Sequence, residues 1–165
     1  MKAHLQTMAR YNAWANARVY GAAAELADEA YRRDVGAFFG SLHGTLNHLM
    51  VTDRIWMRRF TGEGDHPARL DAIMFDDLES LAAARRVEDA RIRRYVDALT
   101  EQRLHADLDY RTTKGVAHRN PLGQLLAHLF NHQTHHRGQA HGILTALGVA
   151  QPPSLDLLGM IREPN

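Results

Sequence analysis

The chain has 165 residues, 45% of them hydrophobic, which is enough for a proper core, so we expect residues 1–165 to form one globular domain. It contains no cysteine, which excludes disulfides, thiolate metal sites and a cysteine nucleophile. Its 20 basic and 19 acidic residues give a net charge of +1, and this balance offers no electrostatic case for binding nucleic acid or a membrane.

The N-terminal part of the chain predicts an amphipathic helix over residues 2–27. This segment is rich in alanine, and apolar side chains recur every three or four positions at Leu5, Met8, Ala15 and Val19. Its early charged and polar residues do not fit a signal peptide, and no apolar run approaches the length of a membrane span. We therefore expect a cytoplasmic protein. Residues 28–36 are charged and irregular, and they predict a connection.

A second amphipathic helix is predicted over residues 38–60. Its apolar face is formed by Phe38, Leu42, Leu46, Leu49, Trp56 and Phe60. Gly62 and Gly64 should end it, and Pro67 prevents its continuation. The loop that follows, over residues 61–75, is long for neighbouring antiparallel helices. Its length favours a connection that crosses one end of a helical bundle.

A third helix is predicted over residues 77–100, because Asp76 followed three residues later by Glu79 resembles a capping box. Its apolar stripe consists of Leu78, Leu81, Ala82, Ile92, Val96 and Leu99. Residues 108–119 alternate apolar and polar side chains around Lys114-Gly115. This pattern predicts a short hairpin with a turn at the glycine.

The fourth long helix should begin at Asn120-Pro121, which supplies an N-cap and a proline at the first helical position, and should end at Gly148. The apolar residues 155–160 suggest a short terminal helix, packed on the bundle or across a dimer. Four helices with one apolar stripe each, and almost no strand, indicate an all-α fold. We predict a four-helix bundle with long crossover connections.

Residues 128–139, HLFNHQTHHRGQ, hold four of the eleven histidines at helical spacing. His128, His132 and His136 are each four residues apart and lie on one stripe, with His135 beside it. On the helical wheel, His136 falls within the apolar face and His132 at its edge, whereas His128 and His135 lie further round. A buried imidazole needs a partner for both nitrogens. We therefore expect His132 and His136 to point inward as metal ligands.

A metal site in a bundle core also needs a ligand from a facing helix, and the second helix offers His43 and His48. His43 falls on a polar arc with Asn47 and Arg54. His48 lies among small and apolar residues that another helix could approach closely, so it is the better third ligand. Three neutral imidazoles leave a coordination position for water or substrate, as in catalytic metal sites.

Other metal enzymes fit the sequence less well. Gln133 occupies the place where a zinc protease of the HExxH type needs its glutamate base. Di-iron bundles require glutamates on their helices, and the fourth helix has none. The chain also has no Gly-rich phosphate loop and no Gly-x-Ser-x-Gly motif.

Three segments closely resemble the DinB family of damage-inducible proteins, within the DinB/YfiT-like superfamily to which metalloenzyme activity is ascribed. They are YNAWANARVY at residues 11–20, LHGTLNHLMVTDRIWMRRF at 42–60 and HLFNHQTHHRGQ at 128–139. The resemblance implies a four-helix bundle with long crossovers, often dimeric, that binds a divalent metal through three histidines. Carried over residue by residue, the family's ligands fall on His48, His132 and His136, the same three that the helical wheel selects.

The resemblance also implies two functional hypotheses. The first is a metal-dependent enzyme, either a transferase that uses a low-molecular-weight thiol or a hydrolase, acting on a small-molecule substrate. The second is a stress-associated metal-binding protein without turnover. Zinc or nickel is the expected ion, and iron or manganese would also be compatible with the ligand set. A homodimer is expected in either case.

Several charged residues on apolar stripes need a separate account. Asp53 lies within the stripe of the second helix, and Glu88 and Asp89 flank that of the third, one turn after Arg85. Such carboxylates should pair with arginine, accept a hydrogen bond from a histidine, or take a proton near the metal. Asp53 is the first candidate for a catalytic role. Arg137 is expected to face the surface or a dimer partner.

Overall fold

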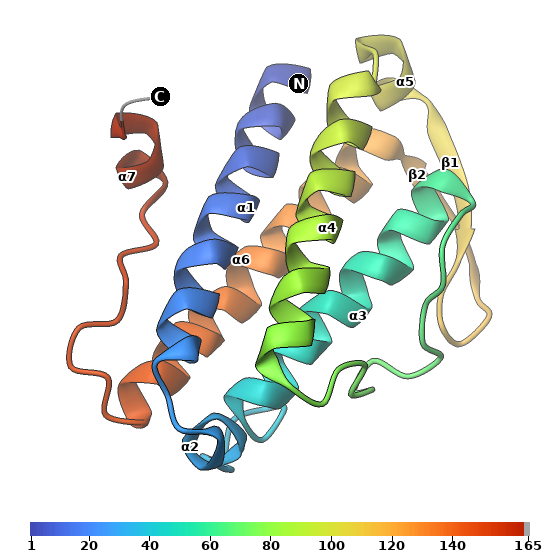
Figure 1. The fold of residues 1–165 in the computed structure, drawn as a ribbon. Coiled ribbons are helices and arrows are strands. Elements are labelled where there is room, and N and C mark those ends of the chain that lie inside the picture. Colours follow the sequence, from blue (N-terminus) through green and yellow to red (C-terminus); the bar gives the residue numbers. More distant parts are fainter. Residues whose placement is uncertain (164–165) are drawn as a thin grey trace.

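The computed structural model describes residues 1–163, and four long helices make up most of it (Figure 1). These are α1 (Lys2–Ala24), α3 (Leu42–Thr61), α4 (Leu78–Ala98) and α6 (Leu122–Ala146). Three short helices and one hairpin complete the fold: α2 (Asp28–Arg32), α5 (Glu101–His105), α7 (Leu157–Arg162), and strands β1 (Asp107–Arg111) and β2 (Ala117–Pro121). The predicted all-α four-helix bundle with a small hairpin is confirmed.

The bundle pairs α1 with α4 and α3 with α6, each pair antiparallel (Figure 1). Because α3 and α4 run in the same direction, the chain between them must return along the bundle. The predicted long crossover is therefore present over residues 62–77, but it follows the length of α3 instead of crossing the end of the bundle (Figure 1).

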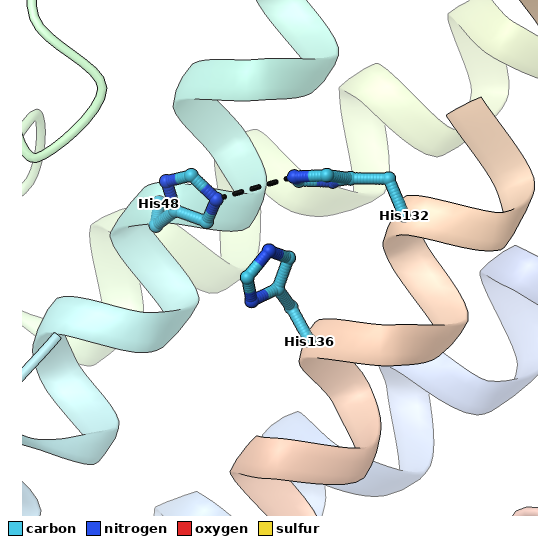
Figure 2. A group of neighbouring side chains, drawn as sticks. All are labelled: His48, His132 and His136. Carbon is cyan, nitrogen blue, oxygen red and sulfur yellow. Dashed lines mark hydrogen bonds between the residues drawn. The ribbon is translucent and has the colours of Figure 1, made fainter. Parts of the chain in front are cut away.

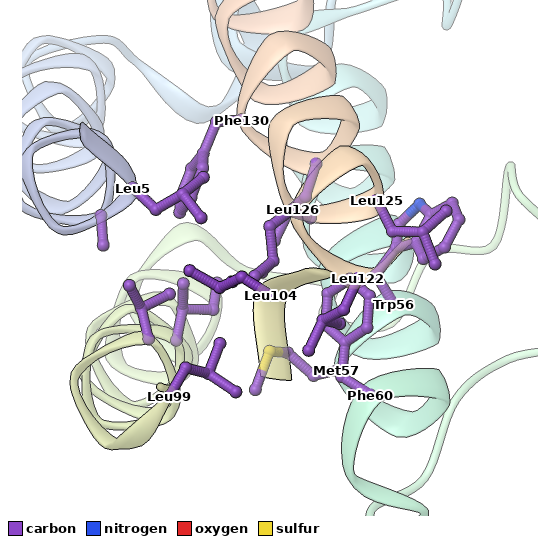
Figure 3. Packing of buried hydrophobic residues seen from close by; sticks show 14 residues of the cluster. Leu5, Trp56, Met57, Phe60, Leu99, Leu104, Leu122, Leu125, Leu126 and Phe130 are labelled. Carbon is purple, nitrogen blue, oxygen red and sulfur yellow. The ribbon is translucent and has the colours of Figure 1, made fainter. Parts of the chain in front are cut away.

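Two apolar clusters fill the interior, one toward each end of the bundle. The first gathers around Trp56, Leu104, Leu126 and Phe130, where α5 closes the bundle (Figure 3). The second gathers around Leu46, Met50 and Ile143 near the other end. The metal-ligand candidates His48, His132 and His136 belong to neither cluster.

The second long helix starts later than predicted, and this changes the role of the preceding phenylalanines. The Ser41 side chain caps α3 by accepting a hydrogen bond from the Gly44 amide at 3.1 Å. Phe38 is therefore not part of the apolar face of the helix, and 83% of its surface is exposed. Phe38 and Phe39 instead lie in a turn that leads into α3.

Gly44 allows this turn to approach the first turn of α3. A Cβ atom at residue 44 would lie 2.2 Å from the carbonyl oxygen of Phe39. We expect Gly44→Ala to lower the free energy of unfolding by about 1–3 kcal/mol, because the backbone must move to relieve the clash. Urea denaturation measures the change. Gly142→Ala is the control: residue 142 has no atom near an added Cβ and lies within α6, so alanine should stabilise by about 0.5–1 kcal/mol. Equal effects of the two substitutions would contradict the prediction.

Other boundaries differ through local capping. The side chain of Asp77, and not that of Asp76, caps α4 by accepting from the Ser80 amide at 2.7 Å. Asn120 lies in β2, so it does not cap α6, which begins after Pro121. The short helix α2 lies where the sequence predicted a connection, and α5 directly follows the predicted end of the third helix. Gly148 does end α6, with a positive φ of 88°.

The terminal helix α7 packs on the bundle beside α1 (Figure 1). The Trp14 indole donates a hydrogen bond of 2.7 Å to Glu163, and the Tyr11 hydroxyl donates one of 2.7 Å to the Leu155 carbonyl. Two aromatic residues of α1, Tyr11 and Trp14, thus hold the C-terminal segment. Within the described residues, none of the helices combines the length and apolar character needed to cross a membrane.

Candidate metal centre

The antiparallel pairing of α3 and α6 brings His48 opposite His132 and His136 (Figure 2). One ring nitrogen from each histidine lies within 4.8 Å of the others. The Nε2 atoms of His48 and His132 are 3.3 Å apart. The three residues predicted as ligands are therefore neighbours in the structure, although 84 positions separate His48 from His132.

Two of the three rings are oriented by hydrogen bonds on the nitrogen that faces away from the centre. His48 Nδ1 lies 2.8 Å from the carbonyl oxygen of Leu70 in the crossover. His136 Nδ1 lies 2.7 Å from Gln139 Oε1, one turn further along α6. Because both acceptors are oxygens, each Nδ1 carries the proton and each Nε2 has a free lone pair. Such outer hydrogen bonds are typical of histidines that ligate metal ions.

The separation of the nitrogens suits a small divalent ion. Zinc binds histidine nitrogen at about 2.0–2.1 Å, so two nitrogens at corners of a tetrahedron around it are about 3.3–3.4 Å apart. The observed 3.3 Å between His48 Nε2 and His132 Nε2 matches this value. The buried Nδ1 of His132 has no hydrogen-bond partner among the described residues. His132 is thus the ring with the least support from the surrounding protein.

The environment keeps the imidazoles neutral, as metal ligation requires. Burial, despite the opposing hydrogen bond to Leu70, lowers the pKa of His48 to about 4. Burial and the neighbouring histidines lower the pKa of His132 to about 3. The pKa of His136 is also lowered, mainly by burial. All three rings are therefore uncharged near pH 7.

A pocket of about 430 Å³ lies over the three histidines. The Phe39 ring stacks on His48 with centroids 3.9 Å apart and meets the edge of His136 at 5.6 Å. Phe38 and Leu70 form further apolar walls, and Asp71, His135 and Gln139 add polar groups. The nitrogens of the centre thus face a space that a small molecule can enter.

The other histidines take different roles. His135 and His128, which the wheel places further round, are exposed: His135 lines the pocket, and His128 packs against Trp56 with centroids 5.2 Å apart. His43, which the helical wheel places on a polar arc, does not face solvent. Its side chain is buried, and its Nε2 lies 3.0 Å from the Phe75 carbonyl, because the crossover covers this face of α3.

Asp53 lies outside the pocket, in a buried ionic network. Its carboxylate is 2.6 Å from Arg85 Nη1, and Arg85 Nη2 is 3.0 Å from Asp89. Gln133, the neighbour of His132, donates a hydrogen bond to the same Asp53 carboxylate. Burial raises the pKa of Asp53 to about 6 against the effect of Arg85. Of the roles considered for Asp53, pairing with arginine is the one that the structure shows.

Arg137 completes this network, so the prediction of a surface position is wrong. It is 2% exposed and donates to the side chains of Asn12, Asn16 and Gln133. The two asparagines in turn donate to Asp89 at 3.0 Å. We call Asn12, Asn16, Asp53, Arg85, Asp89, Gln133 and Arg137 the buried polar network. Glu88 lies outside it and pairs with Arg91 at 3.1 Å.

Sequence reasoning missed three residues that shape the centre. Gln139 follows His136 by three residues, a spacing that could have identified it as a hydrogen-bond partner. Phe39 and Leu70 lie in irregular segments, where periodicity gives no signal about which side chain or carbonyl faces a helix. Their roles become visible only once the turn before α3 and the crossover are placed.

Comparison with known proteins agrees with this architecture. A sequence model of the DinB family matches residues 1–163. The chain is 27% identical over 148 residues to Protein DinB of Bacillus subtilis (strain 168), an alignment that covers 87% of this chain and 86% of that protein. Since the family match spans nearly the whole chain, the resemblance found in the sequence is confirmed, and the chain belongs to the DinB family.

Proposed function

We propose that the protein binds a divalent metal ion through His48, His132 and His136 and uses it as an enzyme acting on a small molecule. The observation that carries this proposal is the convergence of three neutral imidazoles at the floor of a pocket open to solvent. Three ligands leave a position for a further group, as in catalytic sites. A protein that only stores or senses the ion has no need for such an accessible pocket.

An ion in this centre would supply Lewis acidity, lowering the pKa of a thiol or water so that a nucleophile forms near neutral pH. The chain's own residues would fix the rings and shape the pocket. Leu70 and Gln139 hold the tautomers of His48 and His136, and Phe39 shields the stacked face of His48 from water. The chemistry proposed is the transfer of an electrophilic group to the sulfur of a low-molecular-weight thiol, or alternatively hydrolysis.

The ligand set favours zinc or nickel, because imidazole nitrogen suits both, and iron or manganese remain compatible. Asp71 is the one carboxylate among the described residues that line the pocket, and Arg69 at 2.6 Å lowers its pKa. It would therefore act as a fixed negative charge at the rim near pH 7 rather than as a strong base. We further propose that the protein is a cytoplasmic homodimer. Light scattering coupled to size exclusion would test the dimer.

The metal content of purified protein tests the first step. We expect wild type to hold about one divalent ion per chain and His136→Ala to lose at least about tenfold in affinity, since one of three ligands is removed. Elemental analysis after dialysis against a metal buffer gives the measurement. His141→Ala, which removes a histidine of α6 outside the centre, is the control and should retain the ion. Full occupancy in His136→Ala would show that the proposed ligand set is wrong.

Turnover is tested separately on the metal-loaded protein. A panel of low-molecular-weight thiols with a generic electrophile should show consumption that depends on the ion and is lost in His136→Ala. An ester panel without thiol tests hydrolysis. Stoichiometric metal without turnover in either panel would favour the non-catalytic metal-binding function instead.

A further inference from the structure

A second pocket, of about 330 Å³, lies where the C-terminal end of α3 meets the hairpin. Its polar walls are formed by Arg58, Arg59, His66, Arg111, Thr112 and Thr113. We call this the arginine pocket. It is built from three separate segments, α3, the start of the crossover and the β1 end of the hairpin. Segments distant in sequence thus bring three arginine residues to the lining of one cavity.

The positive charge of the arginine pocket is not neutralised by the protein. Among residues 1–163, none of Arg58, Arg59 and Arg111 forms an ion pair with a carboxylate. Arg58 and Arg111 each donate to a backbone carbonyl, that of Gly64 at 2.6 Å and that of Gly115 at 2.9 Å. These bonds orient the two guanidinium groups without cancelling their charge.

Arg59 is the strongest candidate for contacting a ligand. Its guanidinium carbon lies 4.5 Å from the centre of the Trp56 ring and 5.4 Å from that of Tyr110. The side chain makes no hydrogen bond to any residue in the part of the chain that the structure describes. Stacking on two rings holds the planar fork in place while leaving its donors free, which is the arrangement suited to bidentate recognition of an oxyanion.

The remaining wall residues fit the same ligand. The hydroxyls of Thr112 and Thr113 add neutral donors at the rim. Asp109 is the one carboxylate of the lining, and it faces Arg119, whose Nε lies 3.9 Å away. With three arginines against a single, exposed aspartate, an anion gains from entering this cavity.

We propose that the arginine pocket binds the carboxylate or phosphate group of a small molecule. Anion binding in the arginine pocket does not require the metal, but the two sites lie along the same helix. Arg59 follows His48 by three helical turns on nearly the same face of α3, about 16 Å along the axis. The crossover runs from Gly62 beside the arginine pocket to Leu70 at His48. An anionic molecule of sufficient length could therefore be held at both.

Calorimetric titration of the purified protein with inorganic phosphate and with succinate, at low ionic strength, tests the inference. We expect saturable binding of at least one anion, weakened about tenfold or more by Arg59→Gln, since a charge-assisted bidentate contact is lost. Arg111→Gln should weaken it as well, and it provides a second test if Arg59→Gln does not fold. The anion that binds more tightly identifies the chemical class.

Two control variants distinguish anion binding in the arginine pocket from a general effect of positive charge and from binding at the metal centre. Arg94→Gln removes the same charge from an exposed position of α4 and should leave affinity unchanged. His136→Ala, which disables the proposed metal centre, should also leave it unchanged, so failure of the metal site would not affect the result. The inference is overturned if wild type shows no saturation with either anion, if Arg94→Gln weakens binding as much as Arg59→Gln, or if binding disappears in His136→Ala.

Discussion

Replacing Arg85 by methionine is expected to lower the free energy of unfolding by about 3–5 kcal/mol, because it leaves a buried carboxylate without its cation. Arg85 is 2% exposed, and Asp53, with none of its surface exposed, lies 2.6 Å from it. Asp89 loses the same partner but keeps the donors of Asn12 and Asn16. Most of the cost should therefore arise at Asp53, and urea denaturation at pH 7 measures it.

The double variant Asp53→Leu with Arg85→Met should recover much of the loss, since a buried ion pair replaced by apolar side chains is often neutral in stability. Arg86→Met makes the same substitution at the next, exposed position and should change stability by less than about 0.5 kcal/mol. A single Arg85→Met variant as stable as wild type would show that Asp53 does not depend on this ion pair.

The buried polar network also holds α3 and α6 in place around the candidate metal centre. Disrupting the network should therefore disturb the centre. It takes residues from all four long helices, and Gln133 joins it to α3 by donating to Asp53 and, at 3.4 Å, to the carbonyl oxygen of Leu49. Leu49 and Gln133 are the direct neighbours of His48 and His132. The network therefore fixes the register of α3 against α6 at the level where the three rings must meet. Apolar packing alone permits small sliding, whereas a set of directional polar contacts does not.

The elements that the sequence predicted correctly are those governed by helical periodicity. Each long helix carries an apolar stripe of sufficient length, and the wheel positions of His48, His132 and His136 follow from the same geometry. Their meeting in the structure required only that α3 and α6 lie side by side. Whether they hold an ion remains a prediction that the metal analysis addresses.

The helical wheel does not predict burial where burial depends on a neighbouring segment and not on the helix itself. Arg137 was expected at the surface or at a dimer contact because it faces away from the ligands, and His43 was placed on a polar arc with Asn47 and Arg54. Arg137 is buried because α1 offers Asn12 and Asn16 to receive it, and His43 because the crossover supplies the Phe75 carbonyl. Asp53 shows the converse: its place on an apolar stripe correctly implied a buried partner but not which arginine. Such pairings require the positions of two segments, which one helix's periodicity does not contain.

Acidification should destabilise the metal-stripped protein through the rings of His48 and His132. The pKa of His48 is about 4 and that of His132 about 3, below the ordinary value of 6.5, because both rings are buried. Between the folded-state pKa values and 6.5, the unfolded chain binds protons that the folded chain does not. The contribution of the two rings to the free energy of unfolding is therefore fully present above about pH 6.5 and falls as the pH decreases. Each ring contributes at most about 1.4 kcal/mol per pH unit. Allowing for partial solvation, we expect a loss of about 3 kcal/mol between pH 6.5 and 4.5 from these two histidines.

Urea denaturation of chelator-treated protein at several pH values, compared between wild type and the double variant His48→Gln with His132→Gln, isolates this contribution. The difference between the two slopes of unfolding free energy against pH removes the effect of other titrating groups. One of these is Asp53, whose raised pKa acts in the opposite direction, because its carboxyl favours the folded state as it takes a proton. His105→Gln, at an exposed position, should keep the wild-type slope. If wild type and the double variant lose stability in parallel on acidification, the rings are not held neutral by burial. The protein would then lack the preorganised, uncharged imidazoles on which metal binding at this centre depends.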